Sequence, residues 1–255
     1  MSMLPNGKVK ASYVNPKVLV IYGKTKQGKT TVVANLEDNL ILDLEGGTRF
    51  YNCLKIDIVE EAEKSKSTQW QALVEVVKEL KAKKAETGKY PYKFITVDTI
   101  GHLEGVIMPY AMSLYKSTPV GKTFKGDAVA FKALPNGAAW GPIREAFFNT
   151  IAMLNLYCEH LILIAHTKGV SVKRRGEEMT IEDIDVSGKM SQMVAGQSDA
   201  VALIYRNKNQ TILDFSSNER VAAGARNEHL REKAIVVCES DNENNLSFFW
   251  DRVFV

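Results

Sequence analysis

The sequence is poor in cysteine and has no recognisable metal motif. It contains only Cys53, Cys158 and Cys238, and no two of them have C-x-x-C spacing. Scattered, odd-numbered cysteines are typical of reduced thiols in or near the core of a cytosolic protein. His160 stands beside Cys158, but no second pair of ligands accompanies it, which argues against zinc.

Long apolar segments are also missing. No run approaches the roughly 18 apolar residues of a transmembrane helix. The first residues, MSMLPNGKVKASYVNPK, lack the apolar stretch of a signal peptide. We therefore expect a cytoplasmic protein that does not act in a membrane. The net charge of +3 is too small to indicate nucleic acid by itself.

What is present is an alternation of apolar runs and helical stretches over 255 residues. This pattern predicts an α/β fold with a mainly parallel central sheet flanked by helices, and antiparallel strands at the C-terminal end. We expect an N-terminal extension (1–16), a core (17–206) and a β-rich extension of the same domain (207–255). Strands are predicted at 18–22, 40–44, 54–58, 93–97, 161–165, 200–205, 211–215 and 234–238. Helices are predicted at 29–38, 68–84, 101–115 and 142–157, and loops at 116–137 and 168–185.

The most specific motif follows the first strand. Residues 23–30, GKTKQGKT, fit the P-loop pattern G-x-x-x-x-G-K-[ST], with a strand before and a helix after it. Gly23 and Gly28 let the backbone curl so that N–H groups point at phosphate oxygens, and the helix start adds its dipole. Lys29 is predicted to reach the β- and γ-phosphates, and Thr30 to bind Mg²⁺. The predicted nucleotide-binding residues are Gly23, Lys24, Thr25, Lys26, Gln27, Gly28, Lys29, Thr30 and Thr31.

An acidic residue ends a second apolar strand, FITVD. We interpret Asp98 as a second Mg²⁺ ligand, and the alternative is a cap for the following helix. DTIG at 98–101 also fits the D-x-x-G of GTPases. However, NKNQ at 207–210 lacks the carboxylate of the guanine-reading N-K-x-D, so ATP is favoured over GTP.

The strand LILDL runs into Glu45 and two glycines. We expect this strand to neighbour the P-loop strand, which would put Glu45 at the phosphate edge of the sheet. A carboxylate there can act as general base toward the attacking water. The alternative is a solvated turn glutamate.

The order of P-loop, DLEGG, VDTI and HTK resembles the phage-encoded RecA-like ATPases that consist of little more than a recombinase core, over about residues 17–240. The resemblance implies binding of ATP and Mg²⁺, single-stranded DNA as partner, homo-oligomers and a part in phage recombination or annealing. It also implies that Glu45 and Lys29 are catalytic and that His166 senses the γ-phosphate, where glutamine is usual. Only sixteen residues precede the first strand, so we expect no separate N-terminal domain, which argues against RecA-style filaments.

Two segments are candidates for binding single-stranded DNA. The loop after His166 carries a basic patch and then five acids, so a solvated hairpin with paired charges is equally open. The patch consists of Lys168, Lys173, Arg174 and Arg175. The second candidate is 116–132, where lysines alternate with Tyr115, Phe124 and Phe131, although the phenylalanines can equally be core anchors.

Hydrolysis in RecA-like assemblies is often completed by a cation from the neighbouring subunit, which stabilises charge on the transferring phosphoryl group. Arg206 and Lys208 are the first choices for this role, and Arg220, Arg226 and Arg231 are others. Another function is a nucleotide-gated assembly or loader module whose partner is a protein, such as a single-strand DNA-binding protein or replisome component. A small-molecule kinase would need an arginine-rich lid, which the sequence lacks.

Overall fold

The computed structural model describes residues 4, 7–174, 177–217 and 221–255. Its centre is a mixed sheet in the order β11-β10-β8-β7-β1-β5-β4-β2-β3, with β6 paired to β5 and β9 to β7. The strands of the parallel part are β1 (Val18–Gly23), β2 (Asn39–Asp43), β3 (Lys55–Asp57), β4 (Tyr92–Asp98), β5 (Cys158–Arg174) and β7 (Ala200–Asn207). The antiparallel strands are β6 (Glu177–Ile184), β8 (Gln210–Asp214), β9 (Gly224–Ala225), β10 (Ala234–Ser240) and β11 (Leu246–Phe248). The predicted fold class is thereby confirmed.

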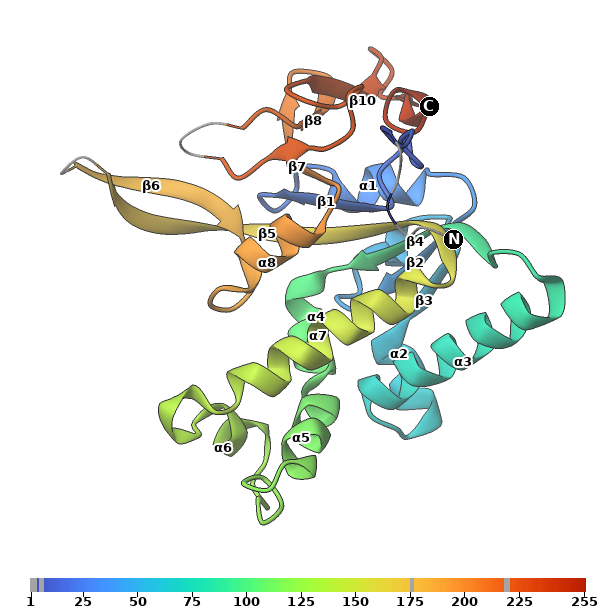
Figure 1. The fold of residues 1–255 in the computed structure, drawn as a ribbon. Helices are drawn as coiled ribbons and strands as arrows, with labels where there is room; N and C mark the ends of the chain where they lie inside the picture. Colours follow the sequence, from blue (N-terminus) through green and yellow to red (C-terminus); the bar gives the residue numbers. More distant parts are fainter. Residues whose placement is uncertain (1–3, 5–6, 175–176, 218–220) are drawn as a thin grey trace.

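Helices lie on both faces of this sheet (Figure 1). They are α1 (Lys29–Ala34), α2 (Ile58–Ser65), α3 (Gln69–Thr87), α4 (Ile100–Val106), α5 (Met108–Ser117), α6 (Ala128–Lys132), α7 (Trp140–Asn155) and α8 (Met190–Gln197). Short 3₁₀ turns occupy Gly47–Phe50, Pro135–Gly137 and Trp250–Arg252. Among the described helices, none combines the length and apolarity needed to cross a membrane.

The alternating side chains of the strands build two cores. In β1, Val20 and Tyr22 join the cluster under α2 to α5, α7 and α8, whereas Leu19 and Ile21 join the cluster under α1 and the C-terminal segment. This period of two is what a strand buried on both faces requires. The sheet is therefore fixed from both sides, and its carboxyl edge is held rigid.

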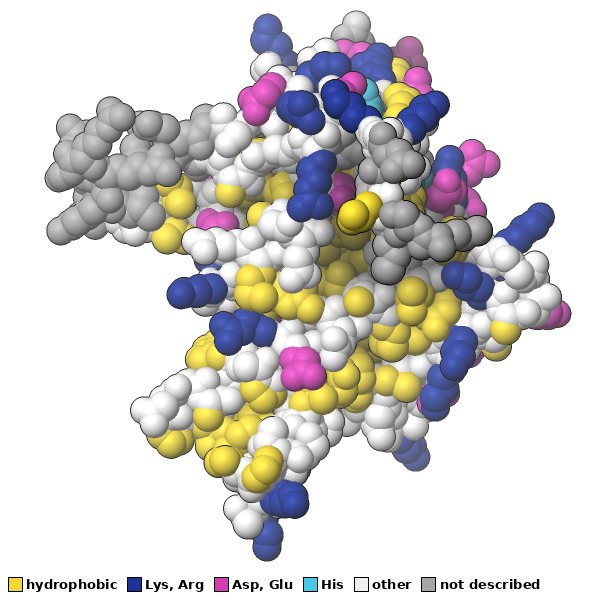
Figure 2. Space-filling view, in the orientation of Figure 1, with side chains coloured by type: hydrophobic (Ala, Val, Ile, Leu, Met, Phe, Trp, Pro, Cys, Tyr) yellow, Lys and Arg dark blue, Asp and Glu magenta, His cyan; other side chains and the backbone are white. Residues whose placement is uncertain are grey.

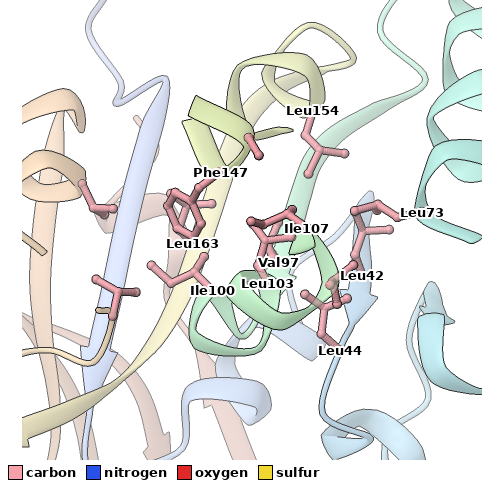
Figure 3. Close-up of a cluster of buried hydrophobic side chains, with 14 of the residues drawn as sticks. Leu42, Leu44, Leu73, Val97, Ile100, Leu103, Ile107, Phe147, Leu154 and Leu163 are labelled. Atoms are coloured by element: carbon pink, nitrogen blue, oxygen red, sulfur yellow. The ribbon is translucent and has the colours of Figure 1, made fainter. Parts of the chain in front are cut away.

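Side chains of β4 and β5 form the middle of the larger core. Figure 3 shows Val97 and Leu163 on these strands beside Ile100 and Leu103 of α4 and Phe147 of α7. All five are at most 1% exposed. Helices α4 and α7 are thus packed directly against β4 and β5.

The prediction of a loop at 168–185 is wrong, whereas the alternative of a hairpin agrees with the structure. β5 continues without a break to Arg174 and pairs antiparallel with β6, from Thr167↔Ile184 to Arg174↔Glu177. The resulting hairpin extends away from the body of the molecule (Figure 1). Alternating β-branched residues in VSVK and MTIED favour strands over coil, which reading the segment only as polar missed.

Three helical predictions also need correction. The helix expected at 101–115 is divided into α4 and α5, with Pro109 in the first turn of α5, where its missing N–H does no harm. The helix after the P-loop ends at Ala34 rather than 38. The 116–137 segment contains α6, and α2 and α8 were not predicted.

The C-terminal strands continue the same sheet. β8 pairs antiparallel with β7, and β10 with β8, as predicted for 211–215 and 234–238. The division at residue 206 is not marked by a break in the sheet and stays a prediction.

In the described residues the three cysteines are unpaired, and two of them are buried. Burial raises the pKa of Cys158 to about 11.

Candidate nucleotide site

The P-loop closes on its own lysine. Lys29 lies in the first turn of α1 and is 6% exposed. Its Nζ donates to the carbonyls of Gly23 (2.8 Å) and Lys24 (2.9 Å) and lies 3.4 Å from Nδ1 of His166. Burial lowers the pKa of Lys29, and the nearby carboxylates of Asp98 and Glu45 oppose that change. The ammonium is thus held at the mouth of the loop, where phosphate oxygens can replace the carbonyl partners.

The two glycines of the motif are required for different reasons. Gly28 has φ +94°, a left-handed conformation that glycine adopts without strain. Gly23 has no positive φ, but a Cβ there would lie 2.5 Å from the carbonyl oxygen of Ile204 in β7. Gly23 therefore serves close packing of β1 on β7 rather than the curling of the loop expected from the sequence.

Thr30 and Asp98 meet as predicted. The Thr30 hydroxyl donates to Oδ2 of Asp98 at 2.8 Å, although the two residues are 68 positions apart. Burial, together with the charges of Asp43 and Glu45, raises the pKa of Asp98 to about 6, although the Thr30 hydrogen bond and the charge of Lys29 act in the opposite direction. A buried carboxylate that accepts a hydrogen bond from a hydroxyl supplies two hard oxygen ligands, and this pair fits Mg²⁺.

Glu45 reaches the cleft, but not beside the P-loop strand. The predicted adjacency of its strand to β1 is wrong, because β4 and β5 lie between β2 and β1. All four strands are parallel, so their carboxyl ends still share one edge. The N–H of Leu44 donates to the carbonyl of Asp98 at 2.8 Å, which ties the two strand ends together.

Asp43 shapes the turn that presents Glu45, and sequence analysis gave it no role. It is fully buried and accepts hydrogen bonds from the N–H groups of Glu45, Gly46, Gly47 and Thr48, at 2.7–3.3 Å. Burial by itself raises the pKa of Asp43, but these bonds and the Thr48 hydroxyl outweigh it, so the pKa lies below its usual range. The sequence did contain a signal for this turn, which is an acidic residue at a strand end with two glycines shortly after it.

His166 lies between the lysine and the glutamate. Its Nε2 is 3.3 Å from the Glu45 carboxylate, and Nδ1 of His102 in α4 is 3.8 Å from the same carboxylate. His102 also contacts the Thr99 hydroxyl at 3.0 Å. His102 was not recognised from the sequence, because nothing in the spacing of α4 signals that it faces the turn after β2.

A cleft of about 370 Å³ collects these groups. Its lining comprises Thr25, Lys26, Gly28, Lys29, Thr30, Thr31, Glu45, Gly47, Tyr51, Asp98, Thr99, His166 and Arg206. Of the predicted nucleotide residues, Gly23 and Lys24 contribute carbonyls to Lys29, and Gln27 accepts the Arg206 N–H at 2.9 Å. Tyr51, absent from the predictions, donates or accepts a hydrogen bond with Thr31 at 2.8 Å.

The other sequence candidates lie elsewhere. Lys168 is at the base of the hairpin, where its Nζ bonds the carbonyl of Val186. Lys173 and Arg174 lie in β5, their side chains fall outside the described part, and Arg175 falls outside the described residues. Lys208 occupies the turn between β7 and β8 with φ 53°.

The aromatic residues of the second DNA candidate belong to the core. Tyr115, Phe124 and Phe131 pack against one another with ring centroids 5.5–5.8 Å apart, and Phe131 is fully buried. They stabilise the α5–α6 region and are not presented for base stacking.

Comparison with known proteins identifies the family of the chain. A family model described as "AAA domain" matches residues 15–227. A KaiC-like protein from the hyperthermophilic archaeon Pyrococcus horikoshii OT3 is similar, with a TM-score of 0.41 and 12% identity over 91% of this chain and 89% of that one. No curated protein matches the chain. Because the family model covers well over half of the sequence, the chain belongs to the AAA-domain family of P-loop ATPases.

Proposed function

We propose that the protein is a Mg²⁺-dependent ATPase that responds to single-stranded DNA. One observation carries the ATPase part: a single cleft is lined by residues from α1, from β4, from β5 and from the turn after β2, namely Lys29, Thr30, Asp98, His166 and Glu45. One such residue often lies at the carboxyl edge of a sheet by chance. Five residues that together can bind and hydrolyse one substrate indicate a function.

The chain's own groups supply binding and orientation. The N–H groups of the P-loop and the ammonium of Lys29 hold the β- and γ-phosphates of ATP. Thr30 and Asp98 are the residues that would hold Mg²⁺, which neutralises charge on the phosphate oxygens when bound. Catalysis of phosphoryl transfer rests mainly on such positioning and charge stabilisation.

Glu45 is positioned to orient the nucleophile. Its carboxylate accepts a proton from a water molecule as the water oxygen attacks the γ-phosphorus and the bond to the β-phosphate oxygen breaks, giving ADP and phosphate. The side chain is 38% exposed, which leaves one side open to water. His166 and His102 hold it from two other directions.

The hairpin supports the DNA part of the proposal. The strand that carries His166 continues directly into the β5–β6 hairpin, so DNA bound to the hairpin would act on the same strand that supplies His166 to the nucleotide cleft. Figure 2 shows lysine and arginine side chains spread over the face in view and mixed with acids over the C-terminal strands. We place the binding of DNA phosphates on the hairpin because its sequence contains Lys173, Arg174 and Arg175.

Steady-state ATP hydrolysis with and without single-stranded DNA tests both parts. The proposal expects turnover that requires Mg²⁺ and rises with DNA. Lys29→Ala should abolish nucleotide binding, and Glu45→Gln should retain binding but lose turnover by about 100-fold or more. Heparin of equal charge serves as a polyanion control. If DNA does not change the rate of turnover, the ATPase part of the proposal remains, and a nucleotide-gated assembly module with a protein partner is favoured. Absence of nucleotide binding would overturn the proposal entirely.

A further inference from the structure

Arg206 occupies the nucleotide cleft of its own chain. Its Nη2 and Nε lie 3.6 and 3.7 Å from the point where a Cβ on Gly28 would sit. Gly28 is the P-loop glycine before Lys29, so the guanidinium lies directly over the loop that receives phosphate. Sequence analysis instead assigned Arg206 to the cleft of a neighbouring subunit.

The sheet fixes this position. β7 pairs in parallel with β1, and Gly23 at the end of β1 packs against the carbonyl of Ile204. The Arg206 N–H also donates to the Gln27 side chain of the P-loop at 2.9 Å. The buried Thr211, which pairs with Arg206 across β7 and β8, contacts the same point over Gly28 at 3.6 Å. The arginine backbone is therefore tied to the P-loop from two sides.

The charges of the cleft are divided between its two sides. β5 and β7 flank the P-loop strand, and His166 approaches Lys29 from the β5 side, where Glu45 and Asp98 also lie. Arg206 approaches from the β7 side. With the described side chains, its guanidinium forms no ion pair and no hydrogen bond. An unpaired guanidinium facing a cleft with backbone N–H groups and a lysine is suited to bind a phosphate through two parallel hydrogen bonds.

We propose that Arg206 binds the phosphates of the nucleotide held by its own P-loop, on the side opposite His166. This inference rests on the proposed nucleotide function. Each cleft then receives this arginine from its own chain and not from a neighbouring subunit. The guanidinium is a fork of fixed donors, so lysine at position 206 would supply the charge without the paired bonds.

Binding of a fluorescent ATP analogue to the full-length chain is the first test. Arg206→Ala should raise the dissociation constant about 10- to 100-fold, as expected for loss of a charge-assisted pair of hydrogen bonds. The dissociation constant of Arg206→Lys should lie between those of Arg206→Ala and the wild type. Because lysine is a smaller change than alanine, this variant keeps the test valid if Arg206→Ala is unstable. Lys233→Ala, which removes an exposed positive charge elsewhere, should bind as the wild type does.

Mixing two impaired variants, at an ATP concentration too low to load Arg206→Ala, separates action on the same chain from action on a neighbour. If Arg206 served a neighbouring subunit, a mixture of Lys29→Ala and Arg206→Ala would contain intact sites and recover turnover. We expect no recovery at any ratio, because no single chain in the mixture carries both residues. Recovery of turnover, or wild-type nucleotide affinity in Arg206→Ala, would overturn this proposal and leave the ATPase function in place. A wild type that binds no nucleotide would instead remove the function on which it rests.

Discussion

The imidazole of His166 joins Glu45, 3.3 Å from its Nε2, to the P-loop. Its other nitrogen, Nδ1, lies 3.4 Å from the ammonium of Lys29. A lysine ammonium only donates and a carboxylate only accepts. The neutral tautomer with its proton on Nε2 satisfies both neighbours, because Nδ1 then accepts from Lys29 and Nε2–H donates to Glu45. His166 is therefore placed to orient the predicted base relative to the phosphate-binding lysine.

Replacing His166 should damage turnover more than binding. In His166→Ala the Glu45 carboxylate loses its orienting donor, and misplacement of such a group costs up to about 100-fold in rate. We expect kcat to fall by about 10- to 100-fold while nucleotide affinity changes by less than about 3-fold. His166→Gln should restore most of kcat, because an amide can donate to Glu45 and accept from Lys29. A His166→Ala variant with wild-type kcat would exclude the orienting role.

Asp98 should make the nucleotide-free protein less stable at neutral pH. The carboxyl titrates near about 3.9 in an unfolded chain, and burial raises its pKa to about 6 in the folded protein. Between these values the folded state binds more protons, so the contribution of this group to the free energy of unfolding decreases as pH rises from about 4 to about 6. Above pH 6 the folded protein carries the whole penalty of a buried charge.

Asp98→Asn removes that penalty, since its side-chain oxygen still accepts from Thr30. The variant should exceed the wild type in free energy of unfolding by about 1–3 kcal/mol at pH 7.5, and the difference should disappear below about pH 4. Urea unfolding in EDTA across this range measures it. Asp251→Asn, which changes an exposed carboxylate, is the control. A difference that does not vary with pH would show that the gain comes from something other than the charge.

The ion pair between Lys24 and Glu182 connects the P-loop to the hairpin. Their Nζ and Oε1 atoms are 2.9 Å apart, and the side chains are 69% and 31% exposed. The hydrogen bond that Lys24 donates to Glu182 raises the pKa of Lys24. Because exposed pairs contribute little to stability, Glu182→Gln should change Tm by no more than about 2 °C. In the proposed ATPase it should reduce stimulation by single-stranded DNA several-fold and leave unstimulated turnover intact.

Stimulation by DNA over its basal rate, measured beside thermal unfolding, tests this coupling. Glu243→Gln, an exposed acid distant from the hairpin, is the matched control and should behave as the wild type. A large loss of Tm would assign the pair a structural role, and unchanged stimulation would show that the hairpin reaches the site through β5 alone.

Local motifs made the phosphate side of the site predictable. The P-loop needs only a strand, eight residues and a helix, so Lys29 and Thr30 were placed without knowledge of the rest of the fold. Asp98 and Glu45 end apolar strands, and parallel strands deliver their carboxyl ends to one edge whatever their order. For this reason Glu45 reached the cleft although the expected neighbour of its strand was wrong.

The sequence by itself determined that a phosphate-binding loop begins at Gly23 and that carboxylates follow apolar strands, because these signals are local in the chain. The tertiary structure decided that β5 lies between β1 and β4, which brings His166 to both Lys29 and Glu45. It also decided that β7 lies on the other side of β1, which brings Arg206 over Gly28. The pairings of β1 with β5 and with β7 join residues more than 100 positions apart, and no window of local sequence specifies them.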